Sequence, residues 1–485
     1  MKKRTLFSQL TLYRYRYIIS TIILSGLLLA VLFLRLDLAP VGLSQQTIDT
    51  VVRSDSFMIS QLFSSSLIDA PYHILQQISL GVFGLNNWGI ALPSITIAIF
   101  TAIIFTIMIK RWFRLDIGLI TSLILVTSVP FLTVARGGVP TITLLFWLSL
   151  ILLLATIVLH GSKRSKLWQS LLVTSVGLSL YTPLMVYALV AVLFAGFLHP
   201  HVRYILRRTP SGMYVATTGI LLVILTPLVI TIASGTTDFK TLLGAPDMIT
   251  RAMLQANVVE AFKVLFGFNA AVIGDLPKPL FLLPVAIIAL LGLIKTVIDH
   301  HSARSYMLLV WLVLLVAPIM LSPMNLYALI VPVLILFAIG LETIIREWYK
   351  LFPRNPYARI GGLIPLSVLI ALVMSSGMFQ YFYGQFYGES NTTYHSAFKT
   401  TEDLAKSNDE AVQIITSDNL APFYSILARE NNDITVDSGR KTTIDNSRLT
   451  LVHREAKLDT DQAPDQIIAR QNKNDSLLLE IYRPR

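Results

Sequence analysis

The chain has 485 residues, of which 54% are hydrophobic and only 14% are charged, and it contains no cysteine. A soluble domain carries about 25% charged residues. Long apolar runs at this low charge therefore indicate a polytopic membrane protein. The net charge of +11 resides in short loops between apolar runs. This is typical of the positive-inside rule and argues against nucleic-acid binding. The absence of cysteine excludes disulfides and thiol nucleophiles.

The chain begins with a basic, aromatic segment that predicts a cytoplasmic N-terminus. Lys2, Lys3 and Arg4 precede a first apolar run over 17–34. This run is long enough to remain as an anchor, and no clear small-residue cleavage site follows it. We therefore expect a retained first span.

A polar segment over 35–87 follows and is expected to form the first outer loop. Its apolar spacing predicts a helix within 43–63 and another over 72–83, both lying along the membrane surface. Asp69 precedes the second helix and Pro71 falls in its first turn. This order is typical of an N-cap followed by an early proline.

The remaining apolar runs predict an all-α polytopic membrane bundle of about eleven transmembrane helices by length. The paired runs 167–181 and 183–198 are short, but basic clusters flank the pair on both sides. The chain must therefore cross and return, and Thr182-Pro183 supplies the break. The expected spans are 17–34, 88–109, 117–134, 141–159, 167–181, 183–198, 213–233, 280–298, 306–321, 326–345 and 360–378.

Charge divides the loops into two sets. Short basic loops fall on the side of the N-terminus, which the positive-inside rule places in the cytoplasm. The other side receives the loops 35–87, 136–140, 234–279 and 322–325, and everything after 378. Since these outer segments are longer and chemically mixed, we expect the function there. The predicted location is the plasma or inner membrane.

The composition becomes polar after residue 378, and this predicts two domains, 1–378 in the membrane and 379–485 outside it. Strand-like runs (AVQII, LTLVH, SLLLEIY) alternate with helix-like runs over 420–429 and 465–471. We expect a small C-terminal extracytoplasmic α/β domain with an accessory role. It has no glycine-rich phosphate loop and no clustered metal ligands, and no metal or cofactor is indicated.

No soluble-enzyme motif is present, so any reactive groups must come from the outer loops. A carboxylate and several cations at the outer interface suit the transfer of a sugar from a lipid-linked sugar phosphate. The cations stabilise the phosphate leaving group. The carboxylate takes a proton from the acceptor hydroxyl. The candidate acids and bases are Asp37, Asp49, Asp55, Asp69, His73, Asp238, Asp247, Glu260 and Asp275. The candidate anion partners are Arg53, Arg136, Lys240, Arg251, Lys263 and Lys278.

Several motifs resemble the GT-C class of membrane glycosyltransferases, of the protein O-mannosyltransferase and lipid A aminoarabinose transferase type. They read APYHILQQISLGVFGLNNWGIALPS, KRWFR, TSVPFLTVARGGVP and LYTPLMVYALV. The resemblance covers roughly 17–233. It implies a polyprenyl-phosphate-linked sugar donor, a protein, lipid or glycan acceptor on the outer face, and an inverting transfer.

The chain departs from the family at two places. Gln45 and Gln46 stand where the family carries carboxylates early in the first outer loop, and Arg136 lacks the acid that tends to follow it. Asp49 lies one helical turn after Gln45, so it is the predicted base, with Asp55 as a second catalytic candidate. Arg53, Arg136, Arg251 and Lys240 are the predicted substrate-binding cations.

Plainer structural interpretations remain open for these residues. Asp49 and Asp55 also fit solvated loop acids, Asp69 a helix cap, His73 a structural residue, and Arg136 a cation that extends to the membrane boundary. Two alternatives to a transferase also remain. A catalytically inactive GT-C-like protein that binds lipid-linked glycan or scaffolds envelope assembly agrees with Gln45 and Gln46. A transporter would need charged groups within the spans, which hold almost none.

Overall fold

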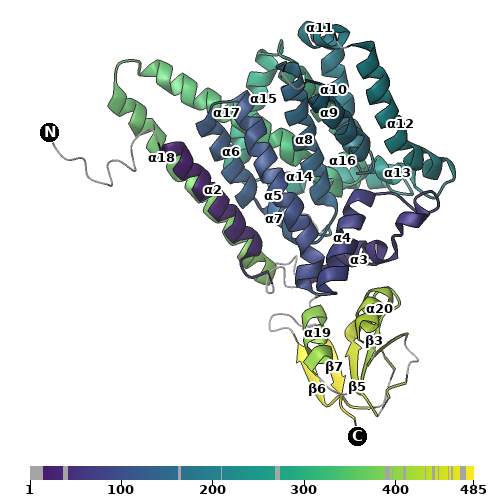
Figure 1. Ribbon diagram of the computed structural model, residues 1–485. Helices are drawn as coiled ribbons and strands as arrows, with labels where there is room; N and C mark the ends of the chain where they lie inside the picture. The colour runs from purple at the N-terminus through teal and green to yellow at the C-terminus, as the bar shows by residue number, and fades with distance from the viewer. Residues whose placement is uncertain are drawn as a thin grey trace.

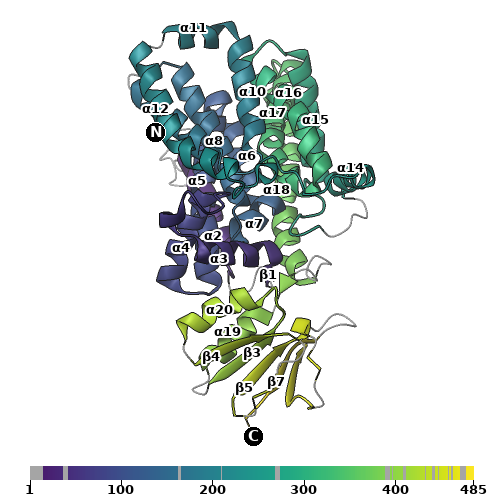
Figure 2. The ribbon, with the colours of Figure 1, turned by 90° about the vertical axis from the view of Figure 1, so that its right-hand side faces the viewer.

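The computed structural model shows a helical bundle with a small α/β domain at one end (Figure 1). We call this end of the bundle the domain end. The opposite end, where α11 (Pro200–Arg208) lies, is the α11 end, and Figure 2 shows the same arrangement. The structure describes residues 15–36, 42–161, 165–208, 210–267, 273–387, 394–395, 397–407, 411–431, 433–439, 443–445, 447–456, 458–459, 462–469 and 477–484.

The bundle is built from apolar helices that pack mainly against partners distant in sequence. The closest pairings are α15 with α17, α5 with α8, and α10 with α16. Both α2 and α18 pack on the α6–α7 pair. The helices are α2 (Arg16–Phe33), α5 (Asn87–Trp112), α6 (Leu115–Thr127), α7 (Val129–Arg136), α8 (Thr141–Leu159), α9 (Ser165–Ser179), α10 (Met185–Leu198), α11 (Pro200–Arg208), α12 (Ser211–Ala233), α13 (Phe239–Leu242), α14 (Arg251–Phe266), α15 (Leu283–Ile298), α16 (Ala303–Leu321), the 3₁₀ helix η2 (Pro323–Leu329), α17 (Ile330–Leu351) and α18 (Pro356–Tyr387).

The protein is a multi-pass membrane protein. Within the described residues, six helices are long and apolar enough to cross a membrane, or seven if one bent pair counts as a span. The predicted count of about eleven is not confirmed, because 18–33, 185–198 and 283–298 form shorter apolar helices. The span expected over 117–134 is not one continuous helix. It breaks at Ser128, where α6 and α7 meet at 59°. The proline at the start of α7 accounts for the break.

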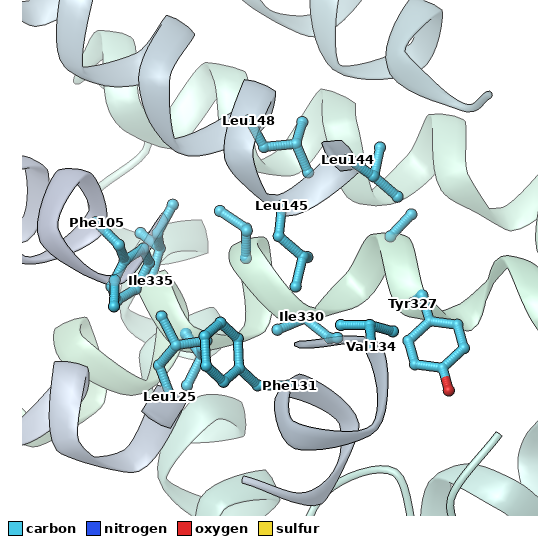
Figure 3. Close-up of a cluster of buried hydrophobic side chains, with 14 of the residues drawn as sticks. Phe105, Leu125, Phe131, Val134, Leu144, Leu145, Leu148, Tyr327, Ile330 and Ile335 are labelled. Atoms are coloured by element: carbon cyan, nitrogen blue, oxygen red, sulfur yellow. The ribbon is translucent and has the colours of Figure 1, made fainter. Parts of the chain in front are cut away.

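The bundle core lies where α6, α7, α8, η2 and α17 meet. Figure 3 shows apolar side chains converging there, with Phe131 and Val134 from α7 facing Leu145 from α8 and Ile330 from α17. All four are buried. This packing fixes the position of the loops that follow α7 and precede η2.

The first outer loop folds into short elements at the domain end. These are β1 (Leu43–Ser44), α3 (Gln45–Ser56), the 3₁₀ helix η1 (Ile59–Gln61) and α4 (Ala70–Phe83). Both helices expected in this loop are therefore present. Ser44 begins α3 as an N-cap, since its side chain accepts from the Thr47 N–H.

The C-terminal domain is a five-stranded mixed sheet in the order β4-β3-β5-β7-β6. The pairs β3–β4 and β3–β5 are parallel, and β7 runs antiparallel to both β5 and β6. Its elements are β3 (Val412–Thr416), β4 (Ile434–Ser438), β5 (Leu449–His453), η4 (Arg454–Ala456), β6 (Gln466–Ala469), β7 (Leu477–Tyr482), α19 (Ala397–Ser407) and α20 (Ala421–Glu430).

The α/β character of this domain and three of its strands agree with the sequence prediction. The helix predicted over 465–471 is wrong, since 466–469 form the edge strand β6. This segment pairs antiparallel with β7, so tertiary pairing overrides a weak local preference. The boundary at 378/379 stays a prediction, and α18 continues past it to Tyr387.

Candidate functional site at the domain end

Asp49, the predicted base, lies on the exposed face of α3. Gln45 Nε2 donates to Asp49 Oδ1 over 2.8 Å, so the two residues share one helix face as expected. Gln45 Oε1 is 3.1 Å from His395 Nε2 on β2 (Tyr394–His395), and His395 Nδ1 is 3.0 Å from Glu455 Oε1. The His395 hydrogen bond lowers the pKa of Glu455 below its usual value. Asp49 thus ends a polar chain that extends into the C-terminal domain.

Asp55, the second predicted acid, forms an ion pair with Arg429 of α20. Further contacts join the same two parts. The Leu85 N–H donates to Glu430 Oε1 over 2.7 Å, and β1 pairs with β2. Ile48 and Val51 of α3 also belong to one buried cluster with Phe423 and Leu427 of α20. Asp55 therefore sits in a docking interface between the first outer loop and the C-terminal domain (Figure 1).

Arg136, a predicted phosphate partner, is buried at the end of α7 and is 1% exposed. Its Nη1 donates to the backbone carbonyls of Val31 and Leu34 at the end of α2. The guanidinium carbon also lies 5.6 Å from the ring centroid of Tyr381 and 5.1 Å from that of Phe382. Arg136 thus connects α7 to α2 and α18, and its predicted role in phosphate binding stays a prediction.

The other predicted cations lie apart from one another. Arg53 is exposed on α3 and acts electrostatically on Asp69 and His73. Lys240 and Arg251 are exposed, on α13 and at the start of α14. Within the described part of the chain, none of these three forms an ion pair with Asp49 or Asp55. Their substrate-binding roles remain predictions.

Asp275 is a carboxylate that, like Arg136, interacts electrostatically with Tyr381. It is half-buried, and the Ser44 hydroxyl hydrogen-bonds its side chain. Tyr327 donates through its hydroxyl to the Asp275 backbone oxygen over 2.9 Å. Tyr381 interacts electrostatically with both Asp275 and Arg136. Burial raises the pKa of Asp275 to about 6, although the Ser44 hydrogen bond opposes that shift.

In the sequence, Asp275 is one of several outer-loop acids, and no local pattern distinguishes it from the others. Its partners come from β1, η2 and α18, which are far apart in the chain. No spacing rule links these segments. We call Ser44, Arg136, Asp275, Tyr327 and Tyr381 the Asp275 cluster.

Asp69 occupies the N-cap position of α4, but its side chain makes no capping hydrogen bond. The expected side-chain cap is therefore wrong. The residue is buried in a left-handed conformation with φ 55°, and its N–H donates to the Tyr181 carbonyl over 2.8 Å. Burial raises the pKa of Asp69 to about 7, with Arg53 and Thr182 opposing the shift. Strained backbone at a buried carboxyl is a feature of functional sites and of packing constraints alike.

His73 lies next to Asp69 in the same polar layer. Its Nδ1 is 2.7 Å from the Ser54 hydroxyl, which also donates to Gln76 Oε1 over 2.6 Å. Burial and the nearby Arg53 charge lower the pKa of His73 to about 4, so the imidazole is neutral at physiological pH. This network supports the structural interpretation of His73, because it fixes α3 against α4.

The donor set of the domain end does not form a clustered metal site. Across the residues that the structure describes, no group of three or more His, Cys, Asp or Glu side chains is placed to hold a metal ion.

The fold is that of the GT-C class of membrane glycosyltransferases, and this confirms the fold predicted from the sequence. The family model described as dolichyl-phosphate-mannose-protein mannosyltransferase matches residues 71–230. This range contains α4 and the bundle helices through most of α12. The comparison with curated proteins finds no match.

Two solved structures share the architecture at low sequence identity. ArnT from Cupriavidus metallidurans, bound to undecaprenyl phosphate, is 12% identical with a TM-score of 0.54, and the match covers 95% of this chain and 97% of that one. The apo oligosaccharyltransferase of Archaeoglobus fulgidus is 10% identical with a TM-score of 0.53, and the match covers 86% of this chain and 64% of that one. The similarity to ArnT thus includes the C-terminal domain as well as the bundle.

Proposed function

We propose that the protein transfers a sugar from a polyprenyl-phosphate-linked donor to a protein, lipid or glycan acceptor of the cell envelope. The observation that carries this proposal is the Asp275 cluster. In it, Tyr381 interacts electrostatically with a half-buried carboxylate, Asp275, and with a buried guanidinium, Arg136, at the domain end of a GT-C fold. The similarity to a structure that contains undecaprenyl phosphate supports a lipid-linked donor.

The domain end is proposed to face the cell exterior, with the N-terminus in the cytoplasm. The distribution of charge supports this orientation. Lys110, Arg111, Arg203 and Arg207 lie on α5 and α11 toward the α11 end, as the positive-inside rule requires of a cytoplasmic side. Donor and acceptor would then meet at the outer interface.

The proposed reaction is a single displacement at the anomeric carbon. The acceptor oxygen forms the new bond to that carbon as the bond to the phosphate oxygen breaks, and polyprenyl phosphate leaves. A carboxylate takes the acceptor proton. Cations stabilise the charge that develops on the phosphate, and Arg53, Arg136, Arg251 and Lys240 are the proposed donors of that stabilisation.

Two carboxylates are candidates for the base, and their environments differ. Asp49, the residue chosen from sequence, is exposed and accepts from Gln45. Asp275 is half-buried, and its pKa of about 6 lies near neutrality, where a general base is most effective. We favour Asp275 for this reason. Asp55 is proposed as a docking residue because it pairs with Arg429.

The test uses the full chain in vesicles, with radiolabelled polyprenyl-phosphate sugars and an envelope extract as acceptor. Wild-type protein should release polyprenyl phosphate and label the extract. Asp275→Asn should lower the rate by about 10²-fold or more, and Asp49→Asn should have a much smaller effect. Asp238→Asn is the matched control, since Asp238 is an exposed cap of α13 in the same outer loop. Full activity of Asp275→Asn with an inactive Asp49→Asn would reverse the assignment.

A catalytically inactive protein that binds lipid-linked glycan is the second candidate. Gln45 favours it, because an amide that bridges Asp49 and His395 cannot accept a proton as a carboxylate does. This candidate would be supported over the transferase if the protein bound polyprenyl-phosphate sugars saturably but transferred sugar from none of the donors to any of the acceptors tested.

A further inference from the structure

A cavity of about 380 Å³ lies between α8, α9, α10 and α16 near the α11 end, far from the Asp275 cluster. Its wall is apolar and includes Leu152, Leu172, Val192, Gly196 and Met307. The volume falls in the range of about 300–1,000 Å³ that is usual for small-molecule sites. Neither the transfer reaction nor the docking interface accounts for it.

The cavity opens toward the lipid. Leu193 and Phe197, which also line it, are 60% and 71% exposed on α10, one of the shorter apolar helices of the bundle. Exposed apolar side chains on a membrane helix face hydrocarbon. Water gains no hydrogen bonds from such a wall. The occupant must therefore present hydrocarbon chains.

One cation marks the polar end of the cavity. Arg304, in the first turn of α16, is half-buried in the cavity wall, and its guanidinium carbon lies 4.7 Å from the ring centroid of Phe113. The carboxylate of Glu342 acts on it electrostatically and offsets part of its charge. His160 and Trp112 lie at the same cavity. A charged residue at the edge of a span usually serves a polar partner.

We propose that this cavity binds an anionic phospholipid from the leaflet at the α11 end, with an acyl chain against α10 and the phosphate at Arg304. Charge complementarity selects this occupant, because a zwitterionic or uncharged lipid would leave the Arg304 charge less well compensated. Basic pockets between membrane helices on the cytoplasmic side characteristically hold anionic head groups. The proposal is independent of the sugar transfer.

The experiment measures lipid retention by native mass spectrometry on the purified full chain in detergent. The probes are phosphatidylglycerol and phosphatidylcholine with identical acyl chains. Wild-type protein should retain one phosphatidylglycerol in preference to phosphatidylcholine. Arg304→Gln should reduce that preference roughly fivefold, and Arg304→Lys should restore most of it. Lys350→Gln is the matched control, since Lys350 is an exposed cation of α17 outside this cavity.

A second variant tests the part of the cavity proposed to hold the acyl chain and changes no charged residue. A Cβ at Gly196 would make only an ordinary van der Waals contact, with Val202 Cγ1 at 3.7 Å. Because Gly196 lines the cavity, the Gly196→Leu side chain should occupy part of its volume. It should displace both lipids. Glycerol 1-phosphate, the head group without chains, should not compete. Equal retention of the two lipids by wild-type protein, or unchanged retention by Gly196→Leu, would overturn the proposal, as would full competition by glycerol 1-phosphate.

Discussion

Arg429 in the C-terminal domain forms an ion pair with Asp55 on α3, and this contact joins the accessory domain to the first outer loop. The pair is one part of a larger interface that includes β1–β2 pairing and a shared apolar cluster. Helix α3 is therefore held from two directions, by the bundle through Gln46 and Thr47 and by the domain through Asp55.

The first prediction concerns this ion pair. Both side chains are partly exposed, so a double-mutant cycle with Asp55→Asn and Arg429→Gln should give a coupling of only about 0.2–1 kcal/mol. Transfer activity should persist in both single variants. The measurements are thermal unfolding in detergent and the vesicle transfer assay. An inactive Asp55→Asn protein with normal unfolding would instead identify Asp55 as catalytic.

The second prediction concerns the contact between α15 and α17. A Cβ at Gly340 would lie 1.9 Å from the Ile288 carbonyl oxygen, so the two backbones touch, as small residues permit in membrane bundles. Gly340→Ala should destabilise the protein by about 1–3 kcal/mol through overpacking. Gly219→Ala is the control, because no atom lies within 4 Å of its added Cβ. It should leave the midpoint of thermal unfolding unchanged or slightly raised.

The third prediction concerns the pH dependence of stability. Folding raises the pKa of Asp69 from 3.8 to about 7. The unfolded chain therefore loses this proton first, and the native state is destabilised as pH rises from about 4 to 7. Asp69→Asn removes the ionisable group. It should raise the unfolding midpoint relative to wild type at pH 8 and have little effect at pH 4.

The control for this prediction is Asp238→Asn, whose exposed carboxyl has a pKa that hydrogen bonds lower. It should show the opposite trend, with a loss of stability at pH 8. If Asp69→Asn destabilised the protein equally at both pH values, the Asp69 side chain would contribute to stability through hydrogen bonding, and the cost of burying its charge would not explain the result.

The fourth prediction concerns the pH dependence of transfer. If Asp275 is the base, it must be ionised, and its pKa is about 6. The rate should therefore fall about tenfold per pH unit below pH 6 and level off above it. Ser44→Ala should shift this limb to higher pH, because the Ser44 hydrogen bond favours the ionised form. If Ser44→Ala left the pH–rate profile unchanged, the fall in rate at low pH would be assigned to another titrating group.

Local patterns determined much of this protein. The apolar runs, the two helices of the first outer loop and the strands AVQII and LTLVH follow from periodicity and length, which depend on neighbours within a few residues. The face shared by Gln45 and Asp49 follows from helix geometry in the same way. The resemblance to GT-C enzymes rests on short motifs of this local kind.

Only the tertiary structure decided which charged residues meet. Three contacts join distant parts of the chain: the pairing of Asp55 with Arg429, the burial of Arg136 against α2, and the contact of Asp275 with Ser44. Burial changes the proton affinity of a carboxyl, and packing from several helices produces burial. Composition and spacing therefore located the end of the molecule that carries polar groups. Packing alone distinguished Asp275 and Asp69 from the exposed acids around them.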